Sequence, residues 1–221
     1  MKIKKLLDLS QPIYHNCPGW PTHPLTSIEL VRSVPINGYN VEFLEMCSHT
    51  GTHLDVPFHF FPDGKTIDQF RIDQFQGEAI VVNLLDKRDN ESIDVIDFKK
   101  IGQKIKSDDI VMFYTGWGRK RGFNNEYYNK WPYLSEEGAK WLAAKEVKGV
   151  GTDGMSIGGL EPSKGRPPHI VLLRKNIWIL EEMYLPEEIL EYERWYLFAF
   201  PILFNNCSGA PVRAVACQFM E

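Results

Sequence analysis

Short apolar stretches recur along the chain, and most of them are closed by polar residues or glycine. They are rich in β-branched and aromatic residues, which are typical of strands. We expect strands at residues 79–85, 110–115, 147–152, 177–180, 195–200 and 212–217. The N-terminal residues 1–10 predict one more strand, and residues 41–46 predict another.

Helical patterns are fewer and shorter. Residues 94–104 have an acidic start and a basic end, and residues 135–145 open with a capping serine and two glutamates. Pro167-Pro168 predicts the first turn of a helix that runs to about residue 175, because a missing N–H costs nothing there. This mixture favours an α/β or α+β fold on a curved sheet over a regularly alternating doubly wound one. With no linker or repeat, residues 1–221 are expected to form a single domain.

Composition and charge exclude several functional classes. Hydrophobic residues make up 43% of the chain and charged residues 24%, which is typical of globular proteins. The net charge is -4 with scattered lysines and arginines, so the basic footprint of a nucleic-acid-binding protein is missing. No apolar run approaches the roughly 20 residues that cross a bilayer, and Asp8 interrupts the apolar stretch that a signal peptide needs. We expect a cytoplasmic protein with no nucleic-acid or membrane partner and with four free cysteines.

The histidines are clustered. Of the six in the chain, three fall within residues 49–59, together with Asp55. Imidazole nitrogens and carboxylate oxygens suit zinc and manganese ions, and a catalytic zinc site typically uses three protein ligands and leaves a position for water. His49, His53 and Asp55 supply that number. The alternative is a polar loop of surface or hydrogen-bonded histidines, which is the commoner situation for any one of them alone.

The segment that carries the cluster predicts a turning loop instead of a helix. Gly51 lies between two threonines and a proline follows soon after, and all of these residue types disfavour a helix interior. Gly51 would let the backbone fold back after the strand at residues 41–46. His53 and Asp55 would then lie beside His49.

His59 and two downstream residues are further candidates. His59 lies between two phenylalanines, where apolar surroundings disfavour the imidazolium and keep its pKa useful near neutrality. We expect it to be a general acid–base, with a third metal ligand or a core histidine as alternatives. His169 falls in the first turn of the predicted helix, and Glu181 follows the predicted strand at residues 177–180. Their pattern alone does not join them to the cluster.

Residues 49–59 read H-T-G-T-H-L-D-V-P-F-H. They resemble the complete H-x-G-T-H-x-D-x-P-x-H signature of the cyclase-like metal-dependent hydrolases, a family that includes bacterial kynurenine formamidase and isatin hydrolase. Further matches to that family's motifs lie at residues 9–12 with Trp20-Pro21, at residues 115–117, at residues 150–156 and at residues 209–213. The resemblance therefore covers nearly the whole chain.

The resemblance implies a swivelling β/β/α-type domain that is usually a dimer or tetramer and holds zinc or manganese. His49, His53 and Asp55 match the ligands of the first ion. Asp55 would bridge to a second ion held also by His169 and Glu181, since the family has members with one ion and members with two.

His59 matches the catalytic histidine of the family. Glu181 is preferred to Glu182 as a ligand because its distance along the chain from the matching histidine is the one that the family uses. Two departures are visible: Gly158-Gly159 stands where the family often has another Asp, and Glu182-Met183 stands where it often has Asn-Leu. Both lie near the expected substrate contacts, so the resemblance does not transfer a substrate.

The expected reaction is hydrolysis of an amide or related acyl bond in a small molecule, with metal-activated water and His59 as the proton carrier. Trp20 and Trp117 would offer a flat wall to an aromatic substrate, although core packing explains such residues at least as often. Two alternatives remain open. One is a lyase or ring-closing enzyme that uses the metal without consuming water, and the other is a non-catalytic metal-binding protein with a closed coordination shell.

Overall fold

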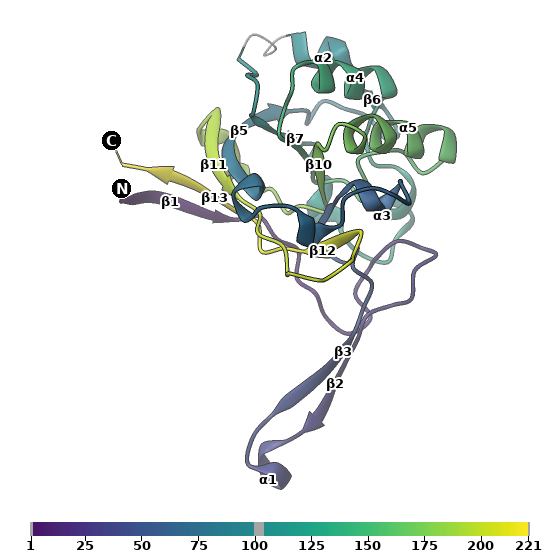
Figure 1. Ribbon diagram of the computed structural model, residues 1–221, viewed down its shortest axis with the longest axis vertical. Coiled ribbons are helices and arrows are strands. Elements are labelled where there is room, and N and C mark those ends of the chain that lie inside the picture. Colours follow the sequence, from purple (N-terminus) through teal and green to yellow (C-terminus); the bar gives the residue numbers. More distant parts are fainter. Residues whose placement is uncertain (1, 100–103, 221) are drawn as a thin grey trace.

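The computed structural model describes residues 2–99 and 104–220 (Figure 1). Within this part of the chain, a curved nine-stranded sheet has the order β1-β13-β11-β5-β7-β9-β10-β4-β12. Strands β5, β7, β9 and β10 pair in parallel at its centre, and the strands on both sides pair antiparallel. The strands span β1 Ile3–Asp8, β4 His53–Asp55, β5 Gln76–Asn83, β7 Ile110–Tyr114, β9 Gly149–Thr152, β10 Trp178–Glu181, β11 Arg194–Phe198, β12 Gly209–Pro211 and β13 Val215–Phe219.

The remaining elements are short or lie on one side of this sheet. Two further strand pairs are separate from it, β2 with β3 and β6 with β8. Their bounds are β2 Ser27–Arg32, β3 Val41–Glu45, β6 Ser92–Ile93 and β8 Tyr133–Leu134. The α-helices are α1 Val34–Asn37, α2 Val95–Lys99, α3 Asn125–Asn129, α4 Glu136–Ala144 and α5 Pro162–Leu173. The 3-10 turns are η1 Pro57–His59, η2 Ile67–Gln69, η3 Ile72–Phe75, η4 Trp117–Lys120 and η5 Glu187–Glu191.

Both faces of the sheet are buried at its centre, which explains why β7 is apolar at every position. In β7, Ile110, Met112 and Tyr114 join one core, while Val111 and Phe113 join the other. The second core packs under α2, α4 and α5, which cover that face of the sheet (Figure 1). The predicted α/β class on a curved mixed sheet with few helices is thereby confirmed.

Most predicted strands are present, with ends that shift by a few residues. The largest difference concerns the histidine-rich segment at residues 49–59, which we predicted as a loop. His53–Asp55 instead forms β4, a strand inside the main sheet between β10 and β12. Such a short strand escapes a periodicity argument, because its pairing partners at Ile179–Glu181 and Gly209–Pro211 are remote in sequence.

One helix prediction is correct, one needs correction, and one falls partly on residues that the structure does not describe. Helix α4 begins after Ser135, whose hydroxyl accepts a hydrogen bond from the backbone N–H of Gly138, as the capping pattern predicts. Of the predicted helix over residues 94–104, α2 contains Val95–Lys99, and residues 100–103 lie outside the described residues.

Helix α5 begins at Pro162, five residues before the predicted first turn. Pro167 and Pro168 therefore lie inside the helix. The N–H that Pro168 lacks leaves the carbonyl of Lys164 without a helical donor, and the backbone N–H of Gly159 donates to that carbonyl at 3.3 Å. His169 consequently lies beyond the first turn, on a stretch of helix that the neighbouring loop holds in place.

Strands β2 and β3 form an antiparallel hairpin that projects away from the body, with α1 at its tip (Figure 1). We call residues 27–45 the arm. The segments at its base lead into the candidate site. Among the described residues, no helix is long and apolar enough to cross a membrane.

Candidate metal centre and active site

Strand pairing brings together residues that are far apart in the sequence. The antiparallel register of β4 and β10 places His53 directly opposite Glu181. Opposed residues on neighbouring strands point to the same face of a sheet, and His53 Nε2 lies 3.7 Å from Glu181 Oε2. Asp55 is two positions further along β4 and therefore points to that face as well. One short strand thus supplies two of the expected ligands.

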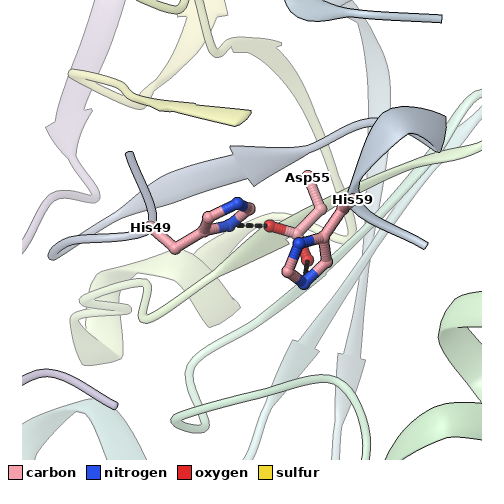
Figure 2. Close-up of side chains that lie close together, drawn as sticks. All are labelled: His49, Asp55 and His59. Carbon is pink, nitrogen blue, oxygen red and sulfur yellow. Dashed lines mark hydrogen bonds and ion pairs between the residues drawn. The ribbon is translucent and has the colours of Figure 1, made fainter. Parts of the chain in front are cut away.

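His49 and His59 approach Asp55 from the segments on either side of β4 (Figure 2). His49 Nδ1 lies 2.7 Å from Asp55 Oδ1, and His59 Nε2 lies 3.9 Å from Asp55 Oδ2. His53 Nε2 lies 3.4 Å from Asp55 Oδ1. The predicted approach of His49, His53 and Asp55 to one another is therefore present.

His169 reaches the same point from α5. Its Nε2 lies 3.1 Å from Glu181 Oε1 and 3.6 Å from Asp55 Oδ2. Glu181 Oε1 also accepts hydrogen bonds from the Ser156 hydroxyl at 3.0 Å and from the Ile157 backbone N–H at 2.7 Å. The fold joins His169 and Glu181 to the first cluster because β10 follows α5 and returns into the sheet beside β4.

Backbone carbonyls determine which imidazole nitrogen faces the centre. His53 Nδ1 donates to the Gly51 carbonyl at 2.8 Å, and His169 Nδ1 donates to the Gly165 carbonyl at 2.7 Å. A carbonyl oxygen only accepts, so Nδ1 carries the hydrogen in both rings and the Nε2 lone pair of a neutral ring points at carboxylate oxygens. A proton on Nε2 or a bound cation between the ring and the carboxylate removes the repulsion between these lone pairs.

The carboxylate of Asp55 gives separate support for a bound cation. Its Oδ2 is buried and has no hydrogen-bond partner among residues 2–99 and 104–220. A buried carboxylate oxygen without a partner is costly, and a bound cation removes that cost. The donor set of imidazole nitrogens and carboxylate oxygens therefore fits a divalent metal.

Burial and the neighbouring charges also shift the pKa values of His53 and His59. Burial lowers the pKa of His53, but the hydrogen bond and charge of Asp55 and the charge of Glu181 outweigh burial and raise it to about 9. Burial lowers the pKa of His59 to about 4, because attraction to Asp55 does not offset burial and the repulsion from His49. His59 is therefore neutral near pH 7 and its imidazole is able to accept a proton.

Two sets of side chains are compact enough to hold an ion. Among the described residues, ligand atoms of His49, Asp55 and His59 lie within 4.8 Å of one another, and so do those of His53, Asp55 and Glu181. Asp55 belongs to both sets, as a carboxylate shared by two ions would. His59 belongs to the first set, so this geometry is compatible with a ligand as well as with a proton carrier.

The cluster lies in a cavity of about 420 Å³. Its apolar lining includes Trp20, Phe60, Met155 and Leu160. Trp117, which we predicted beside Trp20, is absent from this lining. It is 3% exposed and packs in a buried aromatic cluster on which Trp20 rests. Trp117 is the first residue of η4, where its side chain is buried.

Sequence reasoning missed two residues of the cavity wall. His23 lines the cavity, and its Nδ1 is buried without a hydrogen-bond partner in the described part of the chain. Arg166 also lines it, from the same face of α5 as His169 three residues later. Unlike Lys164, which pairs with Glu161, Arg166 has no ion-pair partner within the described residues. The only signals in the sequence were the closeness of His23 to Trp20 and of Arg166 to His169.

Glu182 has partners different from those of Glu181. Its Oε2 accepts hydrogen bonds from Arg121 Nε and from the Tyr127 hydroxyl, both at 3.1 Å. Its backbone has a φ of 52°, in the left-handed region that costs a glutamate free energy. That backbone reversal directs Glu181 and Glu182 to different partners.

Comparison with known proteins identifies the family. A family model described as a putative cyclase matches residues 7–158, which is more than half of the chain. The chain belongs to the cyclase family. The match includes residues 49–59, whereas His169 and Glu181 lie beyond it.

Relatives of this cyclase-family protein match it over nearly their whole length. The kynurenine formamidase of Bacillus anthracis is 31% identical over 222 residues, covering 97% of this chain and 98% of the relative. That of Bacillus cytotoxicus is 30% identical over 218 residues, with the same coverage.

Solved structures share the fold of this cyclase-family protein. Isatin hydrolase A from Labrenzia aggregata, bound to benzyl benzoate, superposes with a TM-score of 0.84 at 20% identity, covering 96% of this chain and 93% of that one. A potential metal-dependent hydrolase with cyclase activity superposes with a TM-score of 0.82 at 24% identity, covering 98% and 99%. Both solved structures therefore share the fold of this chain over nearly its whole length.

Proposed function

We propose that this cyclase-family protein is a metal-dependent hydrolase of an amide or related acyl bond in a small molecule, of the arylformamidase or cyclic-amidase type. One observation carries the proposal: a buried Asp55 oxygen without a hydrogen-bond partner lies where the imidazoles and Glu181 meet, in an apolar-walled cavity. The relatives at 30–31% identity are kynurenine formamidases, which supports the same class of reaction.

His49, His53 and Asp55 would hold a first zinc or manganese ion, and Asp55, His169 and Glu181 a second. When bound, such an ion polarises a carbonyl group and acidifies a water molecule. The protein itself orients the side chains that would hold the ions. Gly51 and Gly165 carbonyls hold two of the imidazole rings, and Ser156 holds Glu181.

His59 is placed to move protons. Its side chain is 28% exposed, whereas those of His53 and His169 are 4% and 6% exposed. As a neutral imidazole it accepts a proton from the attacking water, and Asp55 at 3.9 Å stabilises the imidazolium that forms. It then donates that proton to the leaving nitrogen as the acyl–nitrogen bond breaks.

The cavity wall favours an aromatic amide. Trp20 offers a flat face, and its ring meets that of Trp131 edge-on at 6.2 Å between centroids. We propose that Trp117 contributes from beneath, through the buried cluster that supports Trp20. Arg166 adds an unpaired positive charge to the wall, which suits a substrate that also carries a carboxylate.

A ring-closing enzyme or lyase is the second candidate. The description of the family and one structural relative with cyclase activity favour it. Product mass separates the two reactions, since only hydrolysis adds a molecule of water. A non-catalytic metal-binding protein would instead use His59 as a ligand beside His49 and Asp55 and leave no position for water.

The replacement His59→Ala tests the proposed reaction. With zinc or manganese added, we expect kcat for N-formyl aromatic amines or cyclic amides to fall about 100- to 10,000-fold, because the general acid–base is removed. Metal content should stay at the wild-type value. The exposed His15, replaced in His15→Ala, is the matched control and should keep full activity. Near-wild-type kcat in His59→Ala with intact metal binding would remove His59 from the mechanism.

We also propose that the protein is a cytoplasmic homodimer or homotetramer with a small-molecule substrate and no nucleic-acid or membrane partner. The net charge of -4 supports the absence of a nucleic-acid partner. The exposed surface of the arm supports self-association.

A further inference from the structure

One imidazole of the candidate metal centre is held differently from the others. His53 and His169 each donate from Nδ1 to a backbone carbonyl, so their Nε2 atoms face the centre. In His49 the two nitrogens are exchanged. Its Nδ1 lies 2.7 Å from Asp55 Oδ1 (Figure 2), and its Nε2 lies 2.8 Å from the Ser208 hydroxyl oxygen. The outer partner of His49 is therefore a side chain, which a substitution can remove, whereas the other two rings depend on the backbone.

The pairing of β12 with β4 places Ser208 beside His49. The backbone N–H of Val56 donates to the Ser208 carbonyl at 3.0 Å. The next residue, Gly209, is opposite Asp55 in the antiparallel register of the two strands. Ser208 is thereby held next to the strand that carries Asp55. This contact joins residues that are 159 positions apart, so the sheet register creates it.

Gly209 leaves space for the His49 ring between its two partners. A Cβ added at Gly209 would overlap the Leu54 carbonyl oxygen and would lie 2.8 Å from His49 Cε1. Cε1 is the ring carbon between the two nitrogens, so the glycine lies against the edge of the ring that runs from Asp55 to Ser208. This close approach restricts rotation of the ring, and Nε2 stays directed at the Ser208 hydroxyl.

The chemistry of a metal ligand determines where the hydrogen of this ring must lie. A nitrogen that binds an ion needs a free lone pair, and a neutral imidazole then carries its single hydrogen on the other nitrogen. Since Nδ1 of His49 faces the Asp55 carboxylate, a ligand at this position carries its hydrogen on Nε2. That hydrogen points at the Ser208 oxygen.

We propose that Ser208 positions His49 as a metal ligand by accepting the hydrogen bond from Nε2. The accepted hydrogen keeps the Nδ1 lone pair directed at the Asp55 carboxylate, and it makes that lone pair a stronger donor to an ion. Ser208 is a positioning residue, because it acts through His49 and contacts no reacting atom. The proposal rests on the first metal ion of the proposed function, but it does not depend on which bond the protein hydrolyses.

A hydroxyl group is only partly committed to this role, because it also donates. Donation from Ser208 to Nε2 would place the ring hydrogen on Nδ1, where it would point at Asp55 and compete with an ion. A carboxylate in place of the hydroxyl only accepts, so it removes this competing arrangement. Ser208 is partly exposed, which leaves room for the longer side chain of aspartate.

A chelator competition assay on four variants tests the proposal. For Ser208→Ala we expect the affinity for zinc to fall about 10- to 100-fold, the usual effect of losing a contact behind a ligand. Ser208→Thr keeps the hydroxyl and should bind zinc much more tightly than Ser208→Ala. Ser208→Asp should bind zinc at least as tightly as the wild type. The control Ser107→Ala changes an exposed serine outside the cavity lining and should leave the affinity unchanged.

Nitrogen-15 NMR of the zinc-loaded wild type locates the ring hydrogens without any variant. The His49 ring should carry its hydrogen on Nε2, whereas the His53 and His169 rings should carry theirs on Nδ1. A purely structural role of Ser208 predicts no such exchange.

Three results would overturn the proposal while the metal centre itself stands. They are a hydrogen on Nδ1 of zinc-bound His49, wild-type zinc affinity in Ser208→Ala, and threonine and aspartate variants that bind zinc no better than Ser208→Ala. A wild type that binds no zinc or manganese would instead remove the metal centre, and this proposal with it. None of these readouts uses activity, so a failure to hydrolyse amides is a separate result.

Discussion

Asp153 shows how a single buried carboxylate joins two distant motifs. It accepts hydrogen bonds from the backbone N–H and the hydroxyl of Thr115 and from the backbone N–H of Trp117. Burial outweighs these hydrogen bonds and raises the pKa of Asp153 to about 6. The turn that follows Asp153 carries Ser156, which positions Glu181. Asp153 and Thr115 therefore act on the site by holding this turn, at a distance from the reacting atoms.

Arg166 is the residue from which we expect substrate selectivity. Its guanidinium lines the cavity without an ion-pair partner in the described part of the chain, so it is available to a substrate carboxylate. Arg166→Ala should raise KM about 10-fold for an N-formyl aromatic amine that bears a carboxylate. For the uncharged analogue, KM should not change.

Arg174→Ala is the matched control for this measurement. Arg174 lies at the end of the same helix, outside the cavity lining, and should leave KM unchanged for both substrates. Equal effects of Arg166→Ala on the charged and uncharged substrates would contradict a role in carboxylate recognition.

Helix α5 packs closely against the loop at residues 153–159. A Cβ added at Gly158 would lie 2.3 Å from the Gly165 carbonyl oxygen. The same carbonyl accepts the hydrogen bond from His169 Nδ1. The Gly158-Gly159 departure noted in the sequence therefore permits the contact that orients a proposed metal ligand.

Gly158→Ala should accordingly weaken metal binding. The added methyl group displaces α5 from the loop, and both His169 and Ser156 lose their alignment. Loss of such supporting contacts typically costs 10- to 100-fold in metal affinity, and we expect a change of this size in a chelator competition assay. Gly19→Ala, where an added Cβ meets nothing within 4 Å, should bind metal like the wild type. Wild-type affinity in Gly158→Ala would show that α5 does not need this contact.

For the whole molecule, the proposed metal site links the sheet, α5 and the loops into one unit. An ion that binds only the folded state at 100 times its dissociation constant adds about 2.7 kcal/mol to the free energy of unfolding. For a chain of this length we expect Tm to rise by roughly 5–10 °C on adding zinc or manganese to chelator-treated protein. Calorimetry measures this shift directly.

Asp55→Asn should abolish that rise in Tm, because the shared carboxylate is lost. Asp68→Asn, at a carboxylate outside the cavity, should preserve it. If the Tm of the wild type is the same with metal and with chelator, the cluster does not bind an ion in the folded state.

The sequence by itself determined the properties that follow from local patterns. Apolar stretches indicated the central strands, because a strand buried on both faces must be apolar throughout. The capping pattern at Ser135 indicated α4, because the Ser135 hydroxyl and the backbone N–H that donates to it are only three residues apart. The sequence also indicated that His49, His53 and Asp55 form one cluster, because a turn at Gly51 folds this segment back on itself.

Only the tertiary structure decided what depends on pairing between remote segments. The register of β4 on β10 brings Glu181 to His53, and no local pattern specifies that register. The inward turn at Trp117 and the cavity positions of His23 and Arg166 depend in the same way on what packs against them. These contacts are made between segments separated by many residues, so their free energy is a property of the folded chain and leaves no periodic trace in the sequence.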